Sequence, residues 1–408
     1  MTIPHCQGCG APLTRTLVDL GTMPLANSFV KPDRRGPEPA YPLHARVCDN
    51  CLLVQVDSVV PPGEIFSDYL YFSSYSDSWL AHARLYAAMA IERFALDAKS
   101  MVVEIASNDG YLLTNFIDAG IPCLGIEPAA NVAKAAIAKG VPTEVAFFGT
   151  DTARRLAGQG RRADLLAAKN VLAHVPDIND FVAGIAILLK PEGVFTVEFP
   201  HLMNLIAQVQ FDTIYHEHFT YLSLLAIERV FARHGLRVFD VEEIATHGGS
   251  LRVFVCLNAS ARAEQPGGAA VRAKEVQAQL DRPEGYQGLA ERVDRVRRDL
   301  LAFLDNARSE GRTVAAYGAA AKGNTLLNFC GIGPDRIAFV ADRSTAKQGL
   351  LLPGSRIPVL APDAIFAEKP DYVVVLPWNL IDELSGQLAG IAGWGGRLVT
   401  AIPHLKVQ

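Results

Sequence analysis

The residues best suited to metal binding are four cysteines near the N-terminus, arranged as two C-x-x-C pairs. Cys6 and Cys9 form the first pair, and Cys48 and Cys51 form the second. Zn²⁺ prefers a tetrahedron of soft ligands, and four thiolates leave no coordination position open for a substrate. The spacing therefore predicts a structural zinc ion in a small loop-rich module over residues 1–62. Two unrelated redox or buried cysteine pairs are the alternative.

A second group of reactive side chains lies in the short polar segment Tyr215-His-Glu-His218. Histidine titrates near neutral pH, and a tyrosine hydroxyl can donate to a developing oxyanion. Tyr215 and His218 thus suit removal of a proton beside a ketone and stabilisation of the enolate, while Glu217 would orient an imidazole. The other interpretations are a structural polar cluster and a second metal site. The segment lacks the i, i+4 histidine spacing of a helical zinc motif.

A third group stands where a nucleotide cofactor is usually received, at the end of an apolar run and in the turn after it. This turn contains Glu104, Ala106, Ser107, Asn108, Asp109 and Gly110. Small residues there let a backbone approach a ligand, although the usual glycine fingerprint is absent. The turn alone is therefore a weak indication of a nucleotide site.

The ends of the next two apolar runs strengthen the cofactor hypothesis. About twenty residues after the first turn, Glu127 and Pro128 end the second run, where an acidic side chain can hydrogen-bond both ribose hydroxyls. Asn170 and His174 follow the third run, at the sheet edge where such folds bind ligands. The spacing predicts an adenosine-containing cofactor without separating NAD from S-adenosylmethionine. A plain strand end is the alternative for Glu127.

The C-terminal third repeats this pattern with a basic residue added. Its strand-to-helix turn contains Tyr317, Gly318, Lys322 and Asn324, and the next apolar run ends at Asp342 and Arg343. Backbone N–H groups at a helix start, with a cation beside them, suit a phosphate. We expect these residues to bind a nucleotide diphosphate, with an empty duplicated scaffold as the alternative.

Apolar runs and helical stretches alternate over most of the chain, which predicts an α/β doubly wound fold. A helix is expected over 78–96. The expected strands are 101–105, 123–127, 165–169, 193–199, 237–242, 251–256, 313–317, 336–341, 372–376 and 397–401. The expected domains are the module over 1–62, a Rossmann-like domain over 63–258 and a second Rossmann-like domain over 259–408.

Composition excludes several classes of protein. The 408 residues are 50% apolar and 20% charged, with a net charge of -5, which argues against a nucleic-acid partner. No apolar run is long enough to span a bilayer, and the first residues lack the regions of a signal peptide. A cytoplasmic location is expected, and there the seven cysteines act as thiols or metal ligands.

Taken together, these residues resemble the sugar C-methyltransferase family of deoxysugar biosynthesis, over essentially the whole chain. The resemblance rests on the paired C-x-x-C turns, 104–110, 215–218 and 317–324. It implies an N-terminal zinc module, a central S-adenosylmethionine domain and a C-terminal Rossmann-like domain that binds the nucleotide-sugar. It also implies methylation at C3 of a nucleotide-linked 4-keto-deoxysugar. A monomer or weak homo-oligomer without nucleic-acid or membrane partners is expected.

The resemblance also implies roles for single residues. Glu127 would contact the cofactor ribose, and 104–110 would pass beside the methionine end. His218 would be the leading base, with Tyr215 and Glu217 as partners. His174 would face the same pocket, and one of Tyr69, Tyr71 and Tyr75 would close it. The rival functions are an NAD-dependent nucleotide-sugar oxidoreductase or epimerase and a non-catalytic zinc-module scaffold.

Overall fold

The computed structural model describes residues 3–34, 36–57, 60, 73–75 and 77–408. The chain divides into two compact units, each assembled from separate stretches of sequence. Unit 1 comprises Met1–Leu13, Cys48–His201 and Phe219–Arg282. Unit 2 comprises Thr14–Val47, Leu202–His218 and Pro283–Gln408. The three-domain division at residues 62 and 258 stays a prediction.

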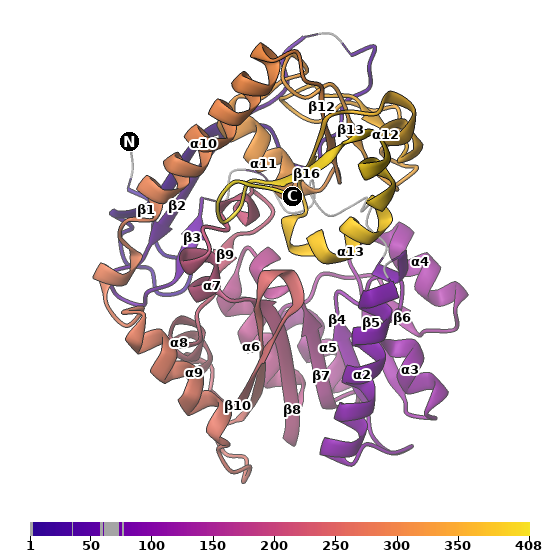
Figure 1. The fold of residues 1–408 in the computed structure, drawn as a ribbon. Coiled ribbons are helices and arrows are strands. Elements are labelled where there is room, and N and C mark those ends of the chain that lie inside the picture. The colour runs from indigo at the N-terminus through magenta and orange to yellow at the C-terminus, as the bar shows by residue number, and fades with distance from the viewer. Residues whose placement is uncertain (1–2, 35, 58–59, 61–72, 76) are drawn as a thin grey trace. The chain divides into compact units, whose positions relative to one another are not determined.

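Unit 1 is built on a seven-stranded sheet with the order β10-β11-β8-β7-β4-β5-β6 (Figure 1). Its strands are β4 (Val102–Ile105), β5 (Cys123–Ile126), β6 (Thr143–Glu144), β7 (Ala163–Lys169), β8 (Leu189–Pro200), β10 (Leu236–Ile244) and β11 (Ser250–Leu257). The strands from β4 to β8 run parallel, and β11 pairs antiparallel with both β8 and β10. β4 and β5 are buried along their whole length, as parallel strands covered on both faces must be. The strands predicted for this region are confirmed.

Helices cover both faces of this sheet. They are α2 (Asp77–Phe94), α3 (Leu113–Asp118), α4 (Ala130–Ala138), α5 (Thr150–Gly158), α6 (Ile178–Leu188), α8 (Leu224–Arg233) and α9 (Pro266–Gln277). Residues of α2 and α3 share a core with Val102 and Leu165. Residues of α5, α6 and α8 share another core with Val103 and Leu166. Neighbouring strand residues enter different cores because successive side chains point to opposite faces of a sheet.

The carboxyl ends of β4 and β7 form the switch point of this sheet. After β4 the chain adds β5 and β6 on one side, and it then adds β7 and β8 on the other. The chain therefore leaves β4 and β7 toward opposite sides of the sheet, and α/β sheets bind ligands at such switch points. The β10–β11 hairpin reaches the same edge, because Ser250 at the start of β11 pairs with Pro200 at the end of β8.

The N-terminal stretch contains more strand than its sequence indicates. In unit 2, β1 (Arg15–Met23) pairs antiparallel with β2 (Tyr41–Val47), where the sequence predicts loops. Register shifts interrupt this pairing twice, and they break the alternation of apolar and polar residues by which a strand is recognised. In unit 1, β3 (Val54–Val56) pairs antiparallel with β9 (Thr220–Tyr221).

Unit 2 contains a second sheet, with the order β14-β13-β12-β15-β16-β17. Its strands are β12 (Val314–Tyr317), β13 (Val340–Ala341), β14 (Val359–Leu360), β15 (Tyr372–Val375), β16 (Arg397–Thr400) and β17 (Lys406–Val407). All pair in parallel except β17. The strand expected over 336–341 shrinks to the two residues of β13, although the Ala338 N–H still donates to the Val314 carbonyl at 3.0 Å.

The helices of unit 2 include one long charged helix. They are α7 (Leu202–Ala207), α10 (Leu289–Ser309), α11 (Ala321–Cys330), α12 (Asp363–Glu368) and α13 (Ile381–Gln387). In unit 1, Pro266 begins α9, where proline is tolerated because a first-turn N–H has no partner within the helix. In the described part of the chain, no helix combines the length and apolar character needed to cross a membrane.

Candidate functional site

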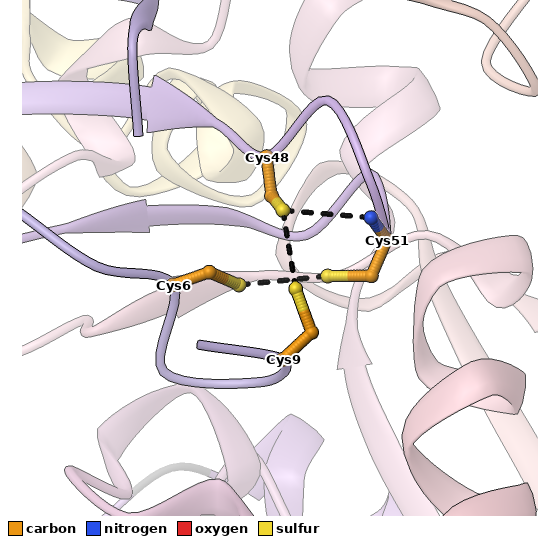
Figure 2. A group of neighbouring side chains, drawn as sticks. All are labelled: Cys6, Cys9, Cys48 and Cys51. Atoms are coloured by element: carbon orange, nitrogen blue, oxygen red, sulfur yellow. Dashed lines mark hydrogen bonds between the residues drawn. The ribbon is translucent and has the colours of Figure 1, made fainter. Parts of the chain in front are cut away.

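The four N-terminal cysteines form one cluster in unit 1. Their sulfur atoms all lie within 4.8 Å of one another. Cys6 Sγ is 3.5 Å from Cys51 Sγ, and Cys9 Sγ is 3.4 Å from Cys48 Sγ (Figure 2). A tetrahedral zinc ion with Zn–S bonds of about 2.3 Å requires sulfur atoms about 3.8 Å apart. The donor set therefore fits a structural zinc ion.

The backbone and the protein core support this cysteine cluster. The Cys51 N–H donates to Cys48 Sγ at 3.4 Å, and the Asn50 amide donates to Cys9 Sγ at 3.5 Å. Three of the cysteines are at most 3% exposed and belong to the same core as residues of α6 and α8. The Asn179 amide of α6 also donates to the Gln7 carbonyl at 2.7 Å. The cysteine turns are thus packed against other parts of unit 1.

The turn after β4 adopts backbone conformations that glycine usually supplies. Ala106 and Asn108 have φ angles of 53° and 49°, and Gly110 has a φ of 78°. A side chain at Gly110 would also collide with Val141, at 2.7 Å. The left-handed region is strained for residues other than glycine, and such strain concentrates at ligand sites. The turn therefore adopts left-handed conformations at Ala106 and Asn108 without the usual glycine fingerprint.

Glu127 joins this turn to the end of β5. Its two carboxylate oxygens accept the Asn108 and Ala129 backbone N–H groups at 2.9 and 2.8 Å. Burial raises the pKa of Glu127, and these hydrogen bonds oppose the shift. Each oxygen has a second lone pair, so the group can also accept a ribose hydroxyl. Burial likewise raises the pKa of Glu104 well above its usual range, with the charge of Lys169 opposing the rise.

Buried polar atoms at this edge that have no hydrogen-bond partner among the residues that the structure describes include Ser107 Oγ, Asp109 Oδ1 and Asn170 Oδ1. Buried polar atoms are normally paired, so these oxygens fit a polar ligand. S-adenosylmethionine offers donors of the matching kind in its ammonium group, its amino group and its ribose hydroxyls. The residues of the switch point therefore fit this cofactor.

His247, which the sequence does not single out, contacts Asn170 in the loop after β7. Asn170 has a φ of 54°, and its amide donates to His247 Nε2 at 2.8 Å. His247, with a φ of 56°, lies in the β10–β11 hairpin and meets the Trp79 ring edge-on at 5.5 Å. His174 ends the turn η2 (Leu172–His174) and is half-buried. His247 carries no local sequence signal, because only the hairpin brings it to Asn170.

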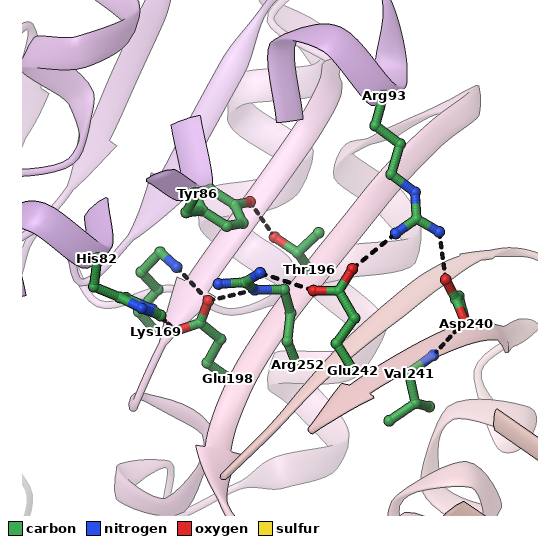
Figure 3. A network of polar contacts seen from close by, with 10 residues as sticks. All are labelled: His82, Tyr86, Arg93, Lys169, Thr196, Glu198, Asp240, Val241, Glu242 and Arg252. Atoms are coloured by element: carbon green, nitrogen blue, oxygen red, sulfur yellow. Dashed lines mark hydrogen bonds and ion pairs between the residues drawn. The ribbon is translucent and has the colours of Figure 1, made fainter. Parts of the chain in front are cut away.

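A row of charged residues, buried except for the half-buried Glu242, crosses the sheet beside this loop (Figure 3). Lys169, Glu198, Arg252 and Glu242 are register neighbours on β7, β8, β11 and β10. Burial alone would raise the pKa of Glu198, but Lys169, the hydrogen bond from His82 and Arg252 lower it below its usual range. His82 of α2 lies 2.8 Å from the Glu198 carboxylate. The row thus fixes α2 and the end of β7, from which Asn170 follows.

Tyr215 and His218 form a hydrogen-bonded pair in unit 2, in the loop after η3 (Phe211–Thr213). The Tyr215 hydroxyl lies 2.9 Å from His218 Nε2, and His218 Nδ1 lies 2.9 Å from the Thr213 carbonyl oxygen. A carbonyl can only accept, so in the neutral ring Nδ1 carries the hydrogen and Nε2 accepts from Tyr215. The Thr213 carbonyl therefore orients the imidazole, in the role that the sequence suggests for Glu217.

Glu217 lies in the same loop but is almost fully buried, at 4% exposure. Its Oε1 accepts the Asn27 amide at 2.6 Å. Burial raises the pKa of Glu217 to about 7, and the hydrogen bond from Asn27 opposes the rise. Asp212, at 0% exposure, accepts the Trp378 indole N–H at 2.8 Å, and burial raises its pKa to about 6. Both carboxyl groups thus titrate near neutral pH.

Replacing Glu217 by glutamine should remove part of the pH dependence of stability. The folded state binds this proton more tightly than the unfolded chain, whose glutamate titrates at about 4.3, so the stabilisation is lost as pH rises from about 4.5 to 7. Thermal unfolding midpoints between about pH 5 and 8 should therefore fall less steeply in Glu217→Gln than in the wild type. The exposed Glu368→Gln serves as the control. Equal slopes in wild type and Glu217→Gln would contradict the assignment.

The predicted nucleotide turn of unit 2 is occupied largely by bonds within the protein. Lys322 Nζ donates to Asn379 Oδ1 at 2.6 Å, and the Asn324 amide donates to the Ala26 carbonyl at 2.6 Å. The Asp342 carboxylate accepts the Ala319 N–H at 2.7 Å. Burial lowers the pKa of Lys322, with Asp212 opposing the shift. Contacts of Lys322 and Asn324 with a substrate stay a prediction.

The remaining predicted site residues are Gly318, Arg343 and the three tyrosines Tyr69, Tyr71 and Tyr75. Gly318 has a φ of 89° at the end of β12, where a side chain would collide with Pro377. Arg343 is exposed. Tyr69 and Tyr71 lie outside the described residues, and Tyr75 is placed only as the last residue of the backbone turn η1 (Ser73–Tyr75). The tyrosine that closes the pocket therefore stays a prediction.

Three protein-family models match consecutive parts of the chain. They describe a zinc binding domain over residues 6–66, a methyltransferase domain over residues 79–241 and a C-methyltransferase C-terminal domain over residues 245–403. Among characterised proteins, the C-methyltransferase NovU of Streptomyces niveus is 36% identical over 406 residues, which cover 99% of this chain and 97% of NovU.

Solved structures match part of the chain. Magnesium protoporphyrin IX methyltransferase (ChlM) of Synechocystis PCC 6803, with bound S-adenosylmethionine, is 13% identical, with a TM-score of 0.36 over 49% of this chain and 99% of that chain. The CcbJ methyltransferase of Streptomyces caelestis is 15% identical, with a TM-score of 0.35 over 43% of this chain and 89% of that chain. The three family models together, and NovU by itself, match the chain over nearly its whole length. The chain therefore belongs to the zinc-containing, S-adenosylmethionine-dependent C-methyltransferase family.

Proposed function

We propose that this enzyme methylates C3 of a 4-keto-deoxysugar carried by a nucleoside diphosphate, in the biosynthesis of a deoxysugar. The observation that carries the proposal is the Tyr215–His218 pair, with His218 Nε2 as the acceptor. Methyl transfer to carbon requires a carbanion, and a base beside a ketone is the simplest source of one. The resemblance of the whole chain to sugar C-methyltransferases supports this choice of acceptor.

The cofactor is assigned to the switch point of unit 1. S-adenosylmethionine supplies an electrophilic methyl group when it is bound. The proposal gives Glu127 the ribose hydroxyls and the turn 106–110 the methionine end. Pro128 and Asn170 complete this site from the ends of β5 and β7. The buried acceptors Ser107 Oγ and Asn170 Oδ1 support this assignment.

The proposed reaction begins with proton removal. The C3–H bond breaks, and its proton passes to His218 Nε2, directly or by way of the Tyr215 hydroxyl. The electron pair forms the C3=C4 bond of an enolate, whose oxygen accepts a hydrogen bond from a tyrosine or from His174. Such a donor contributes roughly 3–4 kcal/mol. C3 then forms its bond to the methyl carbon as the methyl–sulfur bond breaks, which leaves S-adenosylhomocysteine.

The nucleotide end of the substrate is assigned to the second sheet of unit 2. Tyr317 ends β12 and Gly318 follows it, and Asp342 and Arg343 follow β13, which is the parallel neighbour of β12. Carboxyl ends of neighbouring parallel strands meet at one sheet edge, where such folds bind nucleotides. The exposed Arg343 is available for a phosphate.

The experiment is direct product analysis. Purified protein is incubated with S-adenosylmethionine and a thymidine or guanosine diphosphate 4-keto-6-deoxysugar, and the sugar is followed by mass spectrometry and NMR. We expect the mass to rise by one methylene and the new methyl group to appear on C3. Cofactor binding without transfer would mean that the proposed sugar is wrong. A methyl group on oxygen or nitrogen would contradict the enolate mechanism.

A further inference from the structure

The loop that carries Tyr215 and His218, residues 211–218 and here called the base loop, is anchored at several points within unit 2. The Trp378 indole donates to Asp212, the Thr325 hydroxyl donates to the Ile214 carbonyl at 3.0 Å, and the Asn27 amide donates to Glu217. The Phe211 and Phe329 rings also meet edge-on, with centroids 5.4 Å apart. The anchors are distributed along the loop: its side chains are held near both ends, and its backbone is held in the middle, at Ile214.

These anchors converge on helix α11. Thr325 and Phe329 belong to it, and its Asn324 holds the Ala26 carbonyl, immediately before Asn27. Its Lys322 lies 4.9 Å from the centre of the Trp378 ring. One helix therefore supports the base loop directly through Thr325 and Phe329, and indirectly through the residues that bind Glu217 and Asp212.

Helix α11 buries two polar side chains at positions where apolar side chains would pack equally well. Asn324 and Thr325 are each 1% exposed. A helical threonine commonly bonds back to the carbonyl one turn before it, whereas Thr325 reaches a carbonyl 111 residues away in sequence. Apolar residues of similar size would fill the same space without the cost of burying polar atoms. The polar choice therefore points to a role in fixing the loop.

We propose that Thr325 is a positioning residue for the reaction, acting through the Ile214 carbonyl on the peptide that leads into Tyr215; this rests on the proposed function. The Thr213 carbonyl that orients His218 precedes the same peptide, so both members of the pair depend on the anchor. A misplacement of about 1 Å can cost about 10²-fold in rate. Because α11 directly follows the turn after β12, one helix also connects the nucleotide site to the base.

The test compares Thr325→Val, which removes the hydroxyl at nearly constant shape, with Thr325→Ser, which retains it. Thr400→Val is the matched control, since Thr400 is also buried in unit 2, on β16. We expect Thr325→Val to lower kcat by roughly 10- to 100-fold, with KM for both substrates changed by less than about twofold. Exchange of the C3 hydrogen with D₂O should slow in parallel. Thr325→Ser should recover most of the rate, and Thr400→Val should keep it.

The outcomes distinguish failure of the role of Thr325 from failure of the proposed function. Wild-type rates in Thr325→Val, or equal losses in Thr325→Val and Thr400→Val, would overturn the role of Thr325 while the wild-type reaction stands. A loss confined to KM would also overturn it, because it would place Thr325 in substrate binding. A wild-type enzyme that neither exchanges the C3 hydrogen nor methylates the sugar would instead overturn the proposed function itself.

Discussion

Replacing His218 by asparagine should lower turnover by on the order of 10²- to 10⁴-fold and leave the affinity for S-adenosylmethionine nearly unchanged. Asparagine can keep the hydrogen bond to the Thr213 carbonyl, but it has no group that takes a proton near neutral pH. The residues assigned to the cofactor lie in unit 1, and His218 lies in unit 2. Product formation gives the rate, and calorimetric titration gives the cofactor affinity.

The neighbouring histidine provides the control. His216 is 3% exposed, and its Nε2 lies 3.2 Å from the carbonyl oxygens of Tyr41 and Pro42, so its role is to hold the loop. His216→Gln should therefore retain far more activity than His218→Asn. Tyr215→Phe should fall between the wild type and His218→Asn if the hydroxyl relays the proton. Near-wild-type activity in His218→Asn would remove this residue from the mechanism.

Removing zinc should destabilise unit 1 as a whole. Cys6, Cys48 and Cys51 share a core with Phe231 of α8, so losing the ion disturbs the packing of the methyltransferase sheet. Zinc contributes about 10–16 kcal/mol in isolated zinc-finger peptides. A loss of only roughly 3–5 kcal/mol would lower the unfolding midpoint by about 10 °C.

Cys48→Ser, compared with Cys256→Ser, tests this coupling. Cys256 is equally buried, on β11, but lies outside the cysteine cluster. We expect Cys48→Ser to lose bound zinc by metal analysis and to unfold at a markedly lower temperature by circular dichroism. Cys256→Ser should keep its zinc and lose less stability. Loss of zinc from Cys48→Ser with an unchanged midpoint would show that the cluster does not support unit 1.

The parts of the site that could be predicted from the sequence are those that follow directly from a strand or a close spacing. β4, β5 and β7 are short buried runs, and the turns after them are where parallel sheets receive ligands, so Glu104, Glu127 and Asn170 stand out. The two cysteine pairs stand out because each C-x-x-C turn already presents two ligands to one metal ion.

The supporting contacts could not be predicted, because they join distant segments. Asn27 and Glu217 are 190 residues apart in sequence, and Thr325 is 111 residues from Ile214. Neither pair has a local pattern, and each depends on how the stretch 14–47 and helix α11 pack in unit 2. Strand β1 escaped prediction for a different reason, since its register shifts disrupt the period-two pattern.

The most direct measurement is exchange of the C3 hydrogen of the 4-keto sugar with D₂O, followed by NMR with S-adenosylhomocysteine in place of the methyl donor. This isolates proton removal from methyl transfer. If the Tyr215–His218 pair forms the enolate, the wild type should exchange the C3 hydrogen, and His218→Asn should exchange it on the order of 10²-fold more slowly or not at all. A wild type that methylates C3 without catalysing exchange, or a His218→Asn variant that exchanges at the wild-type rate, would contradict this account.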